Sequence, residues 1–115
     1  MFTISARSMA ALQSLALRQA DERLAARAQG RFPHQAAALG VPALVALVGR
    51  VRARAHRHDI DCEWDIARLI DLVLVFGEDV FDAPWVSDVL ALPILTGGEK
   101  LVLLTGRVRP RLPWF

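Results

Sequence analysis

The chain has 115 residues, a hydrophobic content of 54% and a formal net charge of +2. This length suits a single hydrophobic core, and the apolar content excludes a disordered chain. The single cysteine excludes an intrachain disulfide. The first residues do not resemble a signal peptide, and no apolar run approaches the roughly 18 residues that indicate a membrane span. We therefore expect a cytoplasmic protein that does not enter a membrane.

Charge is distributed unevenly along the chain. Residues 1–57 contain nine arginines and two acids, residues 58–106 contain two bases and ten acids, and residues 107–115 contain three arginines. Segments of opposite charge can attract each other within one fold or present different surfaces to different partners. Because the net excess is only two charges, the basic pI is not an argument for nucleic-acid binding.

The first two predicted helices are marked by their ends. Ser5 is a suitable N-cap, because its hydroxyl can accept a hydrogen bond from an unpaired backbone N–H. Apolar residues then recur every three to four positions as far as Gly30, which we expect to end the helix. A short helix follows between Pro33 and Gly40, since proline favours the first turn and glycine the position after the last.

A third helix is expected to open at Val41 and Pro42. Its apolar stripe comprises Leu44, Val48, Val51 and Ala55. Three arginines, Arg50, Arg54 and Arg57, lie on its outward face.

The fourth predicted helix is the most apolar stretch, and we expect it to run through the core. Asp61 is its expected N-cap and Gly77 its terminator. A polar stripe is supplied by Asp65, Arg68 and Asp71. The β-branched residues near its end would also suit a strand, but no partner strand is evident and the helix is favoured.

The last part of the chain contains an acidic loop from Gly77 to Pro84, a short helix that starts at Pro84 and a final helix. Thr96 and Glu99 have the spacing of a capping box at the start of that final helix. These elements predict an all-α fold, a compact helical bundle of four main helices plus one or two short helices. We assign residues 1–106 to a single helical domain and residues 107–115 to a basic tail that contains proline and aromatic residues.

Candidate catalytic and metal-binding residues are few. His56, His58, Asp59 and Cys62 lie within seven residues, but a zinc site normally needs four ligands in paired spacings such as C-x-x-C. No motif for a nucleophile surrounds Cys62 or the remaining histidine, His34. We therefore expect a protein that is not an enzyme and that has no catalytic residues, cofactor or metal.

The acidic loop is the predicted surface for a protein partner. It carries Glu78, Asp79, Phe81 and Asp82, with Trp85 just beyond. Acidic residues that flank an exposed aromatic can steer a basic partner and then anchor it. The competing interpretation is that Phe81 and Trp85 simply close the core.

Nucleic-acid binding is the alternative function, through a basic patch of Arg50, Arg52, Arg54 and Arg57. A solvated face that pairs with the acidic half of the chain is the favoured explanation of these arginines, and no aromatic residue lies among them for base stacking. Trp114 and Phe115 leave two further alternatives open. They dock on their own domain, or they anchor a partner.

Two stretches carry a family resemblance. The first is Thr3-Ile-Ser followed by Met9-Ala-Ala-Leu12, and the second is Ile66-Ala-Arg-Leu-Ile-Asp71 with Phe76-Gly77 and Phe81-Asp82-x-Pro84-Trp85. They resemble small, uncharacterised bacterial proteins associated with type VI secretion and effector gene neighbourhoods. The resemblance implies an accessory role beside a secreted effector, as an adaptor, chaperone or immunity factor, and supplies no catalytic residues. We therefore expect a non-enzymatic protein-binding module.

Overall fold

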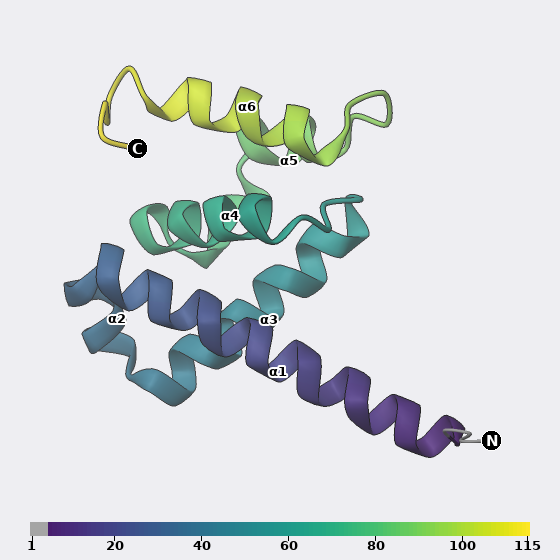
Figure 1. Cartoon of the computed structure of the whole chain (residues 1–115). Coiled ribbons are helices and arrows are strands. Elements are labelled where there is room, and N and C mark those ends of the chain that lie inside the picture. The colour runs from purple at the N-terminus through teal and green to yellow at the C-terminus, as the bar shows by residue number, and fades with distance from the viewer. Residues whose placement is uncertain (1–4) are drawn as a thin grey trace. The chain divides into compact units, whose positions relative to one another are not determined.

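The computed structural model describes residues 5–115, in which helices are joined by turns and no strand is present. Figure 1 shows the elements in chain order. They are α1 (Ala6–Arg31), α2 (Pro33–Leu39), α3 (Val41–Arg57), α4 (Glu63–Phe76), the 3₁₀ helix η1 (Glu78–Asp82), α5 (Pro84–Leu90) and α6 (Gly97–Val108). The all-α prediction is confirmed, with four longer and two seven-residue α-helices in the described range.

The chain divides into two compact units, and the division falls within α3 between Val48 and Gly49. The second unit is Gly49–Phe115. The predicted boundary between residues 106 and 107 lies inside α6, which continues to Val108 because the first proline of the tail comes only two residues later. The assignment of residues 1–106 to one domain stays a prediction.

The first unit contains α1, α2 and the start of α3. The hydroxyl of Ser5 accepts a hydrogen bond from the Ser8 N–H at 3.1 Å, which confirms the predicted N-cap. Gly30 does not end the helix as predicted, because α1 continues to Arg31 and the Phe32 N–H still bonds to a helical carbonyl. Gly40 does end α2, with a φ of +83° that favours glycine.

The apolar stripe of α1 is buried only in its second half. Leu24, Ala25 and Ala28 are buried, whereas Met9 and Leu12 are exposed. The apolar stripe of α1 is therefore buried only where this helix packs on α2, within the same unit. The resemblance-bearing positions Thr3 and Ile4 lie outside the described residues.

The predicted apolar stripe of α3 is confirmed, since Leu44, Val48, Val51 and Ala55 are all buried. The stripe continues across the boundary between the units, which explains why neither its pattern nor a change in composition marks that boundary.

The core of the second unit is centred on α4. Its buried apolar side chains are Ile66, Ala67, Leu69, Ile70, Leu72 and Val73. η1 and α6 both pack on this helix, and α5 packs on η1 and α6 (Figure 1). Gly77 ends α4 with a φ of +96°, as predicted.

Two details of α4 differ from the prediction. The N-cap is Cys62 rather than Asp61, because an Asp61 carboxylate oxygen lies 2.6 Å from Nδ1 of His56 instead of capping the helix. Asp71, one of the three residues of the predicted polar stripe, is fully buried, whereas Asp65 and Arg68 are half-buried. Near the other end of the unit, the ammonium group of Lys100 is buried and donates to the carbonyl of His58 at 2.9 Å.

The tail is part of the second unit and packs against α4 through Phe115. The Phe115 side chain is 4% exposed, and the Arg68 guanidinium lies over its ring at 5.2 Å while donating to its carbonyl oxygen at 2.7 Å. Trp114 is 58% exposed. The first of the two alternatives for the tail therefore holds for Phe115.

Candidate functional site

Two arginines of α3 pair with the acidic residues of η1. Nε and Nη2 of Arg50 bond to the two carboxylate oxygens of Glu78 at 2.9 and 3.0 Å, and Arg54 lies 3.6 Å from Asp82. The hydrogen bonds from Arg50 lower the pKa of Glu78, and the same contact raises the pKa of Arg50. The expected pairing between the basic and acidic parts of the chain is confirmed for these residues.

Phe81 does not form the exposed aromatic anchor expected from the sequence. Its side chain is 3% exposed, and the Arg54 guanidinium covers its ring at 4.8 Å from the centroid. The tight turns of η1 turn Val80 and Phe81 inward and leave Asp79 and Asp82 exposed. Sequence periodicity alone does not reveal this, because a single 3₁₀ turn is too short to show a repeat.

The four arginines proposed for nucleic-acid binding do not form one uniform surface. Arg50 and Arg54 are paired with acids, Arg52 is half-buried and Arg57 is exposed. Their positive charge is therefore partly neutralised within the second unit. An arginine held in a bidentate ion pair must give up that partner before it can bind a phosphate.

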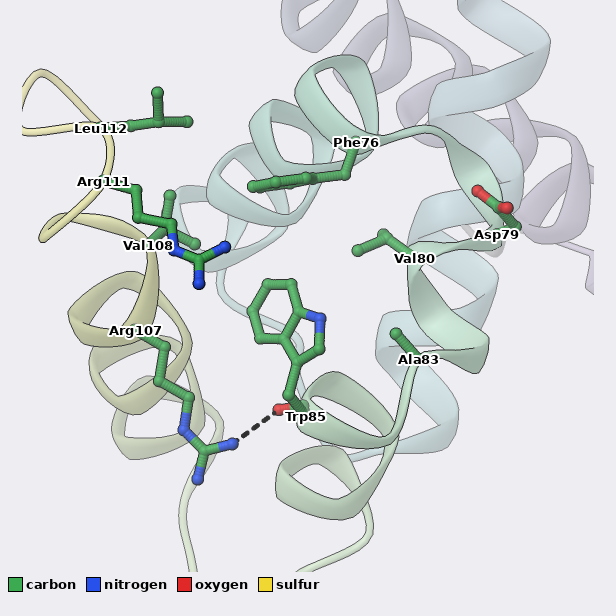
Figure 2. A pocket seen from close by; sticks show the side chains of 9 residues that line it. All are labelled: Phe76, Asp79, Val80, Ala83, Trp85, Arg107, Val108, Arg111 and Leu112. Carbon is green, nitrogen blue, oxygen red and sulfur yellow. Dashed lines mark hydrogen bonds between the residues drawn. The ribbon is translucent and has the colours of Figure 1, made fainter.

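Of the predicted partner-binding residues, the structure brings Asp79 and Trp85 to a pocket of about 660 Å³ in the second unit (Figure 2). This volume is within the range of ligand-binding clefts. The pocket lies among the end of α4, η1, α5, the end of α6 and the tail. Its lining residues are Phe76, Asp79, Val80, Ala83, Trp85, Arg107, Val108, Arg111 and Leu112.

The pocket has an aromatic wall and a charged edge. The rings of Phe76 and Trp85 meet edge to face with centroids 5.8 Å apart. Arg107 donates from Nη1 to the carbonyl of Trp85 at 3.1 Å, which ties α6 to the start of α5. Figure 2 shows Arg107 and Arg111 on one side of the aromatic pair and Asp79 on the other.

Sequence reasoning missed Phe76, Arg107 and Arg111 as members of this site. The signals present were an aromatic residue directly before the helix-ending Gly77 and two arginines four positions apart. Such spacing places two side chains on one face of a helical segment. Neither signal indicates that the two segments meet, because they are about 30 positions apart in the chain.

The candidate metal-binding and catalytic residues do not line this pocket. Within residues 5–115, no three His, Cys, Asp or Glu side chains are grouped so that they could hold a metal ion. Cys62 is exposed, and His34 is exposed on α2 in the first unit. Burial lowers the pKa of His58, and the positive charge of Lys100 lowers it further.

No single helix among the described residues is long and apolar enough to cross a membrane. α2 and α3 together satisfy that criterion by length and composition, but a bend of 103° separates them.

Comparisons with protein-family models, curated proteins and solved structures find no match to this chain.

Proposed function

We propose that the protein is a non-enzymatic protein-binding module that holds an apolar segment of a partner in the pocket of its second unit. The observation that carries this proposal is the exposure of Phe76 at the pocket. Its side chain is 44% exposed although it packs on Trp85. Aromatic side chains that are partly exposed in a concave, largely apolar site are typical anchors for protein partners.

The acidic loop from Gly77 to Pro84 has a different role here from the partner-binding surface predicted from the sequence. Glu78 and Asp82 pair with Arg50 and Arg54 in the part of α3 that belongs to the second unit, and Asp79 is the acidic residue that lines the pocket. Trp85 remains a contact residue, whereas Phe81 supports the core.

Affinity capture with variants tests the proposal. The tagged full chain, a Phe76→Ser variant and a Val102→Ser variant are used to isolate binding proteins from the native host, and the captured proteins are identified by mass spectrometry. Val102 is 70% exposed on α6 and does not line the pocket, so it is a matched control. We expect a discrete partner with the wild type and the control, and its loss with Phe76→Ser. Equal recovery of that partner by a folded Phe76→Ser variant contradicts the proposal.

The resemblance to proteins of type VI secretion neighbourhoods makes a secreted effector the first partner to test, with binding in the bacterial cytoplasm. Co-expression with the products of adjacent genes decides this point, since an effector accessory protein should co-purify with one of them. Co-purification with none of them argues against the secretion role.

Nucleic-acid binding through Arg50, Arg52, Arg54 and Arg57 is the less favoured function, because two of these arginines are held by acids. It predicts DNA affinity that falls steeply as salt rises, since phosphate contacts release counterions. A salt titration of fluorescent duplex DNA measures this slope. Absent or salt-independent binding rules the function out.

A further inference from the structure

We infer that the pocket recognises a peptide segment in which a large apolar residue lies beside an acidic one, with the apolar side chain against Phe76 and Trp85 and the carboxylate at Arg107 and Arg111. This inference rests on the proposed function and specifies the chemistry of the segment that is bound.

The two arginines at the edge of the pocket, Arg107 and Arg111, lie on either side of the end of α6. α6 ends at Val108, and the N–H groups of Arg111 and Leu112 then bond to the Val108 carbonyl at 3.0 and 2.9 Å. This compact turn keeps Arg111 on the same side as Arg107, as Figure 2 shows. The two guanidinium groups therefore face one site rather than two separate surfaces.

These two arginines are available to an anion. Arg107 uses one Nη1 hydrogen bond on the Trp85 carbonyl, and a guanidinium has five N–H donors. The Arg111 side chain is exposed and forms no hydrogen bond or ion pair with residues 5–115. By contrast, the guanidinium groups of Arg50 and Arg68 are both bonded within the second unit.

The two sides of the pocket carry opposite charges. Asp79 lines it on the side away from the arginines, and its carboxylate is exposed (Figure 2). A bound carboxylate is repelled at that side and attracted at the other, because like charges oppose each other and a guanidinium matches a carboxylate in a two-bond geometry. The acidic residue of the segment is thus placed at the arginines, and the apolar residue lies between the two charged sides.

The shape of the aromatic wall favours a side chain over a flat nucleobase. Phe76 and Trp85 are inclined by 76°, so their rings do not present parallel faces between which a base could stack. Val80, Ala83, Val108 and Leu112 complete an irregular apolar surface around them. Branched aliphatic and aromatic side chains fill such a surface well, whereas base recognition relies on stacking against an aromatic face.

Selection of peptides from a random heptapeptide library displayed on phage, with the full chain immobilised, tests this inference. We expect enrichment of sequences in which Asp or Glu lies within two positions of Leu, Ile, Phe or Trp. The most enriched peptide and its analogue with the acid replaced by its amide are then synthesised for calorimetry. Loss of one charge-assisted contact weakens binding about tenfold.

Two variants of the tail provide the specific readout. Arg111→Gln should weaken the acidic peptide about tenfold and leave the amide analogue unchanged, because the lost contact is to the carboxylate. Arg109→Gln removes the same charge from the same turn, but Arg109 does not line the pocket. We expect it to bind both peptides as the wild type does.

Several results overturn the inference. One is enrichment of peptides without acidic residues, and another is equal affinity for the acidic peptide and its amide analogue. A third is an equal effect of Arg109→Gln and Arg111→Gln on the affinity for the acidic peptide. The last is displacement of the bound acidic peptide by adenosine monophosphate at a lower concentration than by free copies of the same peptide. An apolar peptide that binds with no charge preference, and is lost in Phe76→Ser, removes this inference but leaves the proposed function intact. Failure to select any peptide also overturns the inference, and the capture experiment then decides the proposed function separately.

Discussion

Replacing Phe115 by alanine should destabilise the second unit as a core substitution does, although this residue lies in a segment rich in arginine and proline. The ring is 4% exposed, and the Arg68 guanidinium covers it at 5.2 Å. The hydrogen bond from Arg68 goes to the backbone carbonyl of Phe115 and is retained in the variant. The measured loss therefore belongs to the ring.

The expected loss in the free energy of unfolding is about 3 kcal/mol. A buried Phe→Ala change costs roughly 3–5 kcal/mol in a rigid core, and the lower value applies because the turn that carries Phe115 can collapse onto the space that is left. The lost cation–π contact, about 0.5–1 kcal/mol at a partly exposed site, is included in this figure.

Urea unfolding monitored by tryptophan fluorescence is a selective assay for this effect. All three tryptophans of the chain, Trp64, Trp85 and Trp114, belong to the second unit, so the signal follows that unit alone. If the unfolding free energy depends on urea concentration with the same slope in the variant and the wild type, the difference between their midpoints gives the difference in the free energy of unfolding.

Trp114→Ala is the matched control, because it removes the neighbouring aromatic side chain, which is 58% exposed. We expect a loss below about 1 kcal/mol, as for most surface substitutions. If Phe115→Ala and Trp114→Ala shift the transition equally, the tail is not part of the core and the reasoning is refuted.

Three further predictions concern local features of the same unit. The pKa of Glu78 is lower in the folded than in the unfolded chain, so its contribution with Arg50 is present above about pH 4.5 and is lost as the pH falls through the folded value. Glu78→Gln should remove up to about 1 kcal/mol at pH 7 in urea unfolding, and this loss should shrink steadily as the pH is lowered below 4.5. A loss independent of pH contradicts this. Thr96→Ala should cost about 1 kcal/mol by removing the capping box, and Thr96→Ser should retain most of it; equal losses by thermal unfolding argue against capping. Gly77→Ala should cost about 1–3 kcal/mol at a φ of +96°, whereas Gly106→Ala within α6 should stabilise by about 0.4–1 kcal/mol; the same sign for both in denaturant unfolding rejects the backbone argument.

Much of the secondary structure was predictable because its signals are local. The Ser5 cap, the ends at Gly40 and Gly77, and the capping box of Thr96 and Glu99 each depend on atoms within a few residues of one another. The two errors at helix ends have equally local causes. Gly30 lies inside a helix that continues to Arg31, and the carboxylate of Asp61 pairs with His56 instead of capping α4.

The candidate site was only partly predictable. Asp79 and Trp85 were among the predicted partner-binding residues, and both line the pocket. Phe81 was chosen for an exposure that it does not have. Whether an aromatic residue near a helix end is buried depends on which element packs over it, and that element can lie far away in the chain.

The amino-acid sequence by itself determined that the chain is helical, where most helices begin and end, and that its charges are separated along its length. Only the tertiary structure decided how those charges are used. Arg50 and Arg54 are held by Glu78 and Asp82, whereas Arg107 and Arg111 are brought beside Phe76 and Trp85 with unused donors. The physical reason is that caps and amphipathic stripes are short-range, but an ion pair or a pocket exists only where segments distant in the chain meet.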